Sequence, residues 1–130
     1  MSEVVNIKRP YAVWTVGNEE YKLKLTTSSI VDLETKYKCN LLELINVNTS
    51  TGVPALSVML DVTHAALQKY HHGKKKADVY DMFDEYEDNG GSQLQFFMSV
   101  FLELYTVSGF FSSKMADQIR DELSNAQKDL

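Results

Sequence analysis

Residues 92–109 read SQLQFFMSVFLELYTVSG, and this segment is expected to form the central helix of the protein. Its polar side chains recur every three or four positions, so that on a helix they share one narrow stripe. Apolar side chains occupy the remaining faces, and a helix that is apolar over most of its circumference is enclosed by other elements. The polar stripe consists of Ser92, Gln95, Ser99, Glu103 and Thr106.

Both ends of this helix carry local signals. Residues 89–91 (NGG) supply a turn before Ser92, which is a suitable N-cap, and Gly109 is a suitable residue to end the helix. A membrane-spanning helix is the competing interpretation. Burying Gln95 and Glu103 in hydrocarbon would be costly, and the run is short for a bilayer, so the sequence favours a core helix and no membrane partner.

A β-hairpin is predicted near the start of the chain. Residues 11–16 (YAVWTV) are rich in β-branched and aromatic side chains, and residues 21–25 (YKLKL) alternate between apolar residues and lysine. Gly17 and Asn18 lie between them and are typical of a hairpin turn. Because a lone hairpin is marginally stable in water, its apolar face is expected to pack on helices.

Two helices are expected after the hairpin. The first has Ser29 and Asp32 at capping-box spacing and continues through Tyr37. Cys39 and Asn40 interrupt it, and Asn40 can cap a second, short helix.

Three more helical segments complete the pattern outside the central helix. A polar loop over residues 46–52, expected to be flexible, precedes a helix that follows Pro54 and continues to about Tyr70. The next helix covers residues 78–87, and the last covers residues 112–127 and has a thin apolar stripe. The outer side of the helix before the central one is acidic and contains Asp78, Asp81, Asp84, Glu85, Glu87 and Asp88.

These elements predict an α+β fold that is mostly helical. The N-terminal hairpin is expected to pack on a bundle of about five to six helices around residues 92–109. Residues 1–10 are expected to form a flexible leader and residues 11–111 a single globular domain. Residues 112–130 are expected to form a C-terminal amphipathic helix at the periphery of that domain.

Composition and charge limit the classes of function. The formal net charge is −5, which argues against a general nucleic-acid binder. Cys39 is the only cysteine, so no internal disulfide can form, as is usual in a reducing compartment. Residues 1–10 lack the apolar core of a signal peptide, and we therefore expect a cytoplasmic location.

The sequence contains no recognisable catalytic motif. His64 follows Asp61 by three residues, a spacing that can orient a histidine for acid–base chemistry or metal binding, but no third ligand or nucleophile lies nearby. The acidic run from Asp84 departs from the calcium-loop pattern at Tyr86 and Asn89. We therefore expect no catalytic residue, no metal ligand and no cofactor, and the lack of motifs argues against an enzyme without excluding one.

A basic corner is predicted over residues 69–76, which include His71 and His72. Cations at the C-terminal end of a helix are stabilised by its dipole. The same residues can also dock an acidic partner or a phosphate backbone. The acidic total favours the first interpretation.

Apolar residues near the C-terminus form the candidate partner-binding surface. Two phenylalanines follow the glycine that ends the central helix, and aromatic residues at the ends of elements either cover the core or anchor a partner. Both interpretations apply at this point. The candidate residues are Phe110, Phe111, Met115, Ile119 and Leu123.

The order of these features resembles that of a known family. The features are a hairpin ending in residues 21–26 (YKLKLT), a helix carrying Leu33 and Glu34, residues 41–44 (LLEL), a polar loop, the Pro54 helix, an acidic helix and an apolar helix ending near Gly109. Over residues 11–111 the chain resembles the small tail assembly chaperones of long-tailed bacteriophages and prophages, and the related small proteins of gene-transfer-agent clusters.

The resemblance implies a non-catalytic protein of the infected bacterial cytoplasm that is absent from the mature virion. Its implied partners are the tape measure protein, which it keeps soluble, and the tail tube protein, with self-association in addition. Three alternatives remain open. They are a structural virion component such as a head–tail connector or tail completion protein, a regulatory or nucleic-acid-binding domain that uses residues 71–76, and an enzyme that uses His64.

Overall fold

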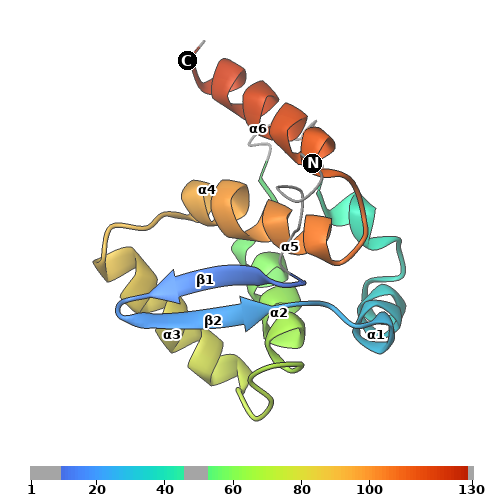
Figure 1. The fold of residues 1–130 in the computed structure, drawn as a ribbon, viewed down its shortest axis with the longest axis vertical. Helices are drawn as coiled ribbons and strands as arrows, with labels where there is room; N and C mark the ends of the chain where they lie inside the picture. Colours follow the sequence, from blue (N-terminus) through green and yellow to red (C-terminus); the bar gives the residue numbers. More distant parts are fainter. Residues whose placement is uncertain (1–9, 46–52, 129–130) are drawn as a thin grey trace, which may run out of the picture.

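The computed structural model describes residues 10–45 and 53–128, and in it a β-hairpin packs on a set of helices (Figure 1). The predicted fold class, α+β and mostly helical, is confirmed. The predicted flexible loop over residues 46–52 and the predicted leader, except for Pro10, lie outside the described residues.

The hairpin consists of β1 (Ala12–Val16) and β2 (Glu19–Leu23), which are antiparallel. Gly17 in the two-residue turn has φ +60°, a conformation that glycine adopts without steric cost. β2 begins two residues earlier than the alternating pattern suggested, because Glu19 pairs with Val16.

The end of the hairpin is tied to two helices by one residue. The Lys24 N–H donates to the Ala66 carbonyl in α2 (Leu56–Leu67) at 3.0 Å. Its Nζ donates to the Val107 carbonyl, at the end of the central helix, at 2.9 Å. This second bond supplies a donor to one of the last carbonyl groups of the helix, which find no N–H partner within the helix itself.

The first helix, α1 (Thr27–Tyr37), begins earlier than the sequence suggested. Its cap is Thr26, whose Oγ1 accepts from the Ser29 N–H at 3.2 Å, so Ser29 is not the capping residue. The short helix η2 (Leu41–Leu44) has 3₁₀ geometry and is capped by Asn40, as expected.

Helices α2 and α3 (Lys76–Asp88) cover one face of the hairpin (Figure 1). α2 begins after Pro54, as predicted, but ends at Leu67 rather than near Tyr70. The core side of α3 contains the expected residues Val79, Met82 and Phe83.

The central helix spans residues 93–107 and changes its winding in the middle. Ser92 is its N-cap, as predicted, and Gly109 beyond its end has φ +91°. The Leu102 N–H donates to the Phe97 carbonyl, the five-residue spacing of a π-helix. Its parts are α4 (Gln93–Phe96), the π-helical segment η3 (Phe97–Phe101) and α5 (Leu102–Val107).

Trp14 of the hairpin joins these layers. Its side chain is fully buried, and its ring centroid lies 5.0 Å from Phe96, 5.9 Å from Tyr86 and 6.4 Å from Phe83. The contacts with Phe96 and Tyr86 are edge-on, and such contacts add to the free energy gained from burial alone. The tryptophan is therefore the point at which β1, α3 and the central helix meet.

Candidate functional site

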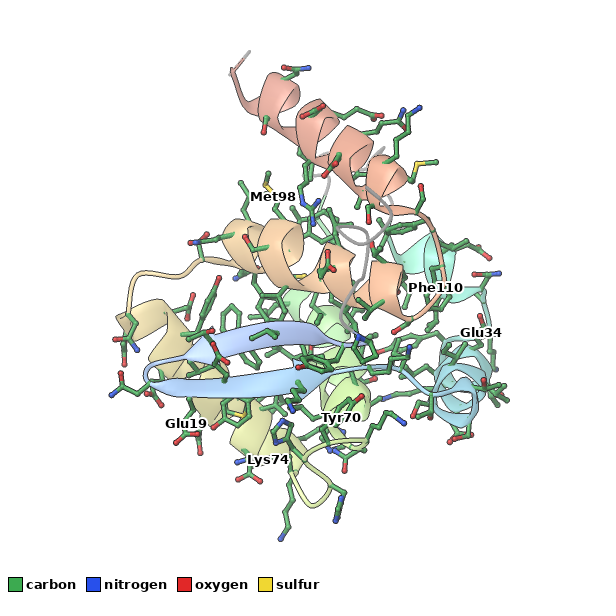
Figure 2. The ribbon with its side chains drawn as sticks, in the orientation of Figure 1. Glu19, Glu34, Tyr70, Lys74, Met98 and Phe110 are labelled. Carbon is green, nitrogen blue, oxygen red and sulfur yellow. The ribbon has the colours of Figure 1, made fainter. Side chains whose placement is uncertain are left out.

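Two aromatic rings lie where the chain turns from the central helix into α6 (Ser113–Lys128). Phe110 and Phe111 are half-buried because both rings pack on Tyr105 of α5. The ring centroids lie 4.7 Å and 6.0 Å from that of Tyr105. Phe110 is seen at the end of α5 in Figure 2. The two rings thus cover the core and still keep part of their surface accessible.

One polar contact caps the start of α6, and a second holds α6 beside the central helix. The Met115 N–H donates to Ser112 Oγ at 3.2 Å, which caps the start of α6. Arg120 Nε donates to the Met98 carbonyl at 2.7 Å, within the π-helical segment. α6 therefore runs over the middle of the central helix, in agreement with Figure 1.

Leu123 is placed differently from the other four candidate residues. It was expected at a partner-binding surface, but it is only 5% exposed and belongs to the core together with Ala116. The apolar stripe of α6 turns Leu123 inward, because this stripe is the side by which the helix packs on the domain. Leu123 holds α6 in place and does not contribute to an accessible surface.

The short helix η2 completes the surroundings of the aromatic pair. Tyr105 Oη donates to the Leu41 carbonyl at 2.9 Å, and the Leu41 side chain is fully buried. This contact anchors the first residue of η2 against α5. The next residue, Leu42, is turned outward and is 41% exposed, and Ile45 is half-buried.

The η2 region, the turn after α5 and α6 line an open apolar groove of about 290 Å³. Four of the five predicted partner-binding residues line it, and the η2 region contributes two more that were not predicted, Leu42 and Ile45. No charged side chain is among the lining residues, which are Leu42, Ile45, Phe110, Phe111, Met115 and Ile119. We call this surface the α5–α6 groove.

Asp61 and His64, whose spacing can orient a histidine, have separate hydrogen-bond partners. His64 Nε2 donates to the Lys74 carbonyl at 2.9 Å, and it helps to hold the turn after α2. The histidine therefore has a structural partner.

Asp61 instead joins three helices. Its Oδ2 accepts hydrogen bonds from Lys36 Nζ and Tyr37 Oη, each at 2.6 Å, and Lys76 Nζ lies 3.0 Å from Oδ1. Burial alone would raise the pKa of Asp61, but the hydrogen bonds from Lys36, Tyr37 and Lys76 outweigh it and lower the pKa to about 2. Burial and the contact with Asp61 raise the pKa of Tyr37. This cluster connects α1, α2 and α3 and stabilises the fold.

The predicted basic corner packs against tyrosine rings of the hairpin side. Lys74 Nζ lies 5.4 Å from the Tyr21 ring centre, and Lys22 Nζ lies 5.7 Å from that of Tyr70 (Tyr70 and Lys74 are labelled in Figure 2). His71 Nε2 accepts from the Lys22 N–H at 2.9 Å. Burial and the charges of Lys74 and Lys22 lower the pKa of His71. These cations are part of a packed cation–π cluster.

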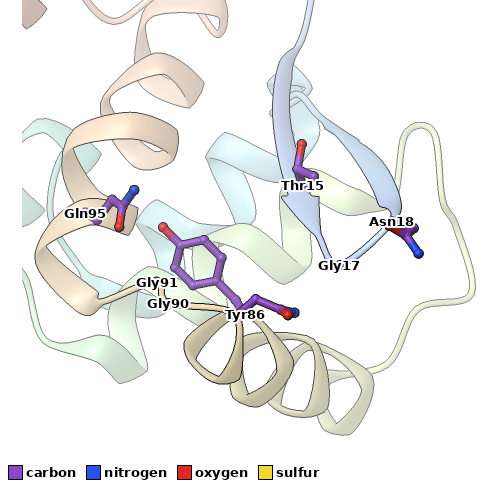
Figure 3. Close-up of a pocket in the computed structure, with 8 residues that line it drawn as sticks. Thr15, Gly17, Asn18, Tyr86, Gly90, Gly91 and Gln95 are labelled. Atoms are coloured by element: carbon purple, nitrogen blue, oxygen red, sulfur yellow. The ribbon is translucent and has the colours of Figure 1, made fainter.

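A polar hollow of about 380 Å³ lies between the hairpin turn and the segment that joins α3 to α4 (Figure 3). Tyr86 packs directly on Gly91, where an added Cβ would collide with the ring. None of the lining residues carries a carboxylate, imidazole, thiol or amine, so the hollow offers no acid–base pair. The lining residues are Thr15, Gly17, Asn18, Tyr86, Asn89, Gly90, Gly91 and Gln95.

Residues 10–45 and 53–128 contain no group of three or more histidine, cysteine, aspartate or glutamate side chains that could hold a metal ion. Within the same residues, no helix is both long and apolar enough to cross a membrane.

Comparison with known proteins gives one match. A family model covers residues 7–129, and the family, DUF6096, is described as a family of unknown function. No curated protein and no solved structure matches the chain.

Proposed function

The chain belongs to the DUF6096 family, and we propose that it is a tail assembly chaperone of long-tailed bacteriophages or prophages. In this proposal it binds the tape measure protein before the tail tube encloses it, and it promotes assembly of the tail tube. It acts without catalysis, in the cytoplasm of the host cell, and is absent from the mature virion.

The observation that carries the proposal is the α5–α6 groove. Leu42 and Met115 on its rim are 41% and 46% exposed. Large apolar side chains that gather on a concave surface are typical of protein-binding sites. A helix with apolar residues at positions i, i+4 and i+7 can lay that stripe into such a groove. A tape measure protein exposes apolar helical stripes of this kind until the tube covers them.

The remaining surface supports the same role through its charge. The net charge is −5, and the outer side of α3 carries acidic side chains such as Asp81 and Glu85. A chaperone has to offer apolar surface to its client while the complex stays in solution, and a charged exterior serves that need. We extend the proposal to two further contacts, with the tail tube protein and with other copies of this chain.

Co-expression tests this function. The chain is produced together with the longest coiled-coil-rich protein encoded beside its gene, and the soluble fraction is analysed by pull-down and size-exclusion chromatography. We expect one soluble complex that contains both proteins, and we expect the large partner to become insoluble when this chain is omitted.

The main alternative, a structural virion component, makes the opposite prediction for purified particles. Mass spectrometry of purified virions should not detect the chain if it is a chaperone. A stoichiometric amount in virions, together with no complex in the co-expression experiment, would exclude the chaperone and favour a head–tail connector or tail completion protein.

A further inference from the structure

A second groove lies between α2 and α3, and it shares no residue with the α5–α6 groove. Its volume is about 320 Å³. Leu60 and Phe83 are 5% and 2% exposed and form its floor, and Leu56 at the start of α2 is half-buried beside them. The lining residues are Leu56, Ser57, Leu60, Tyr80, Phe83, Asp84 and Glu87.

One stripe of α3 forms a whole side of this groove. Tyr80, Phe83, Asp84 and Glu87 are spaced by three, one and three residues, which places them along one helix face. Tyr80 is 50% exposed. Most of its side-chain surface belongs to the aromatic ring and is apolar. The groove is therefore apolar along its length and open to solvent. A helix of another protein can lie in it, between α2 and α3.

The rim of this groove is acidic. Asp84 and Glu87 are exposed, and neither forms an ion pair within the described residues. The chain has no lysine or arginine between Lys76 and Lys114, so no cation of this segment balances them.

The charges of α3 are also unfavourable for the helix itself. Its last turn carries acidic residues and no basic residue. The C-terminal end of a helix has a partial negative charge, so acidic side chains destabilise it and cations there stabilise it. A cationic partner at this end of α3 would thus improve both the rim electrostatics and the helix.

We propose that the α2–α3 groove binds an amphipathic helix of a partner protein whose apolar stripe is flanked by lysine or arginine. The apolar floor takes the stripe, and Asp84 and Glu87 pair with the flanking cations. The α5–α6 groove has no charged lining residue, so the two grooves select different helices. This inference does not depend on which protein occupies the α5–α6 groove.

Two designed peptides test the proposal with the full-length chain. Each has about 18 residues, five helical turns, with leucines at i, i+4, i+7 and i+11. One has lysine and the other glutamate at the flanking positions. Fluorescence anisotropy should show binding of the lysine peptide, with an affinity that falls as salt is added, and binding of the glutamate peptide that is weaker by about tenfold or more.

Matched variants separate the groove from general charge attraction. Asp84→Lys with Glu87→Lys should lower the affinity for the lysine peptide by about tenfold. Asp121→Lys with Glu122→Lys makes the same change of charge on exposed positions of α6 and should leave the affinity within about twofold. Tyr80→Ser should lower the affinity for both peptides by the same factor, because it reduces the apolar surface of the groove and leaves the rim charges in place.

Three outcomes would overturn the proposal. The first is equal affinity for the two peptides, and the second is an equal loss in the α6 control. The third is a stable dimer of the chain alone, seen by analytical ultracentrifugation, that Asp84→Lys with Glu87→Lys dissociates, because the occupant would then be a second copy. Circular dichroism of each variant establishes that the fold is retained.

Discussion

Tyr105 Oη donates a hydrogen bond of 2.9 Å to the carbonyl oxygen of Leu41, which lies 64 residues earlier in the chain. This hydrogen bond joins the central helix to η2, and it helps to place Leu42 at the rim of the α5–α6 groove. The Tyr105 ring also packs against the rings of Phe110 and Phe111. Two sides of the groove therefore depend on one buried side chain.

Replacing Tyr105 with phenylalanine should weaken the fold. The Leu41 carbonyl would lose its donor in a buried position, which costs about 1–3 kcal/mol. Urea denaturation followed by circular dichroism measures this loss. Tyr80→Phe is the control, because its residue is 50% exposed and its free energy of unfolding should change by less than about 0.5 kcal/mol. Equal stability of Tyr105→Phe and the unmodified protein would show that the bond contributes nothing.

Asp61 gives the stability a defined dependence on pH. Its pKa is about 2 in the folded protein against an ordinary value of 3.8, so the folded state favours the ionised form. The resulting stabilisation, about 2 kcal/mol, is fully present above pH 4 and is lost as the pH falls from about 4 to about 2. Thermal unfolding at several pH values should show this loss.

Asp61→Asn separates this effect from those of other carboxylates. The variant should be less stable at neutral pH by about 2 kcal/mol, because the asparagine cannot pair with Lys36 and Lys76. Its stability should also decline less than that of the unmodified protein between pH 4 and pH 2. Parallel pH profiles for the two proteins would rule out Asp61 as the titrating group.

Arg120 should control how firmly α6 is held. Arg120→Ala removes the hydrogen bond to the Met98 carbonyl, and bonds from charged donors contribute about 1.5–3 kcal/mol. Hydrogen exchange of the α6 amides should become faster by about tenfold or more, while that of α2 stays unchanged. Lys114→Ala removes an exposed cation from the same helix and should leave exchange unaltered. Slow exchange in Arg120→Ala would mean that apolar packing alone holds α6.

Local patterns in the sequence were sufficient for most of the architecture. The alternation of residues 21–25 identified the second strand, and the polar stripe of residues 92–109 identified the central helix with its cap at Ser92. The cap at Asn40 was also evident. Each of these features is set by residues that are close in sequence, and their spacing alone therefore predicts them.

The features that were missed depend on contacts between distant segments. Thr26 and Ser29 are both suitable caps by residue type, and the structure uses Thr26. Asp61 is buried because its partners come from α1 and α3. The π-helical winding at residues 97–101 has no signal in its own residue types.

The candidate groove was predictable only in part for the same reason. Phe110, Phe111, Met115 and Ile119 are close in sequence, and their proximity suggested one surface. Leu42 comes beside them through contacts between distant segments, such as that between Tyr105 and Leu41, which spacing cannot indicate.

Binding of the tape measure protein in the α5–α6 groove is tested by comparing the affinity of two matched variants for that protein. Leu42→Ser with Met115→Ser removes the two most exposed apolar side chains of the groove, and Val31→Ser removes a side chain that is 54% exposed on α1. All of these positions are exposed, so the three chains should have the same circular dichroism and thermal stability. We predict that the groove variant loses about tenfold or more in affinity and no longer keeps the tape measure protein soluble, while Val31→Ser does both as well as the unmodified chain. Undiminished binding by the folded groove variant would contradict this account.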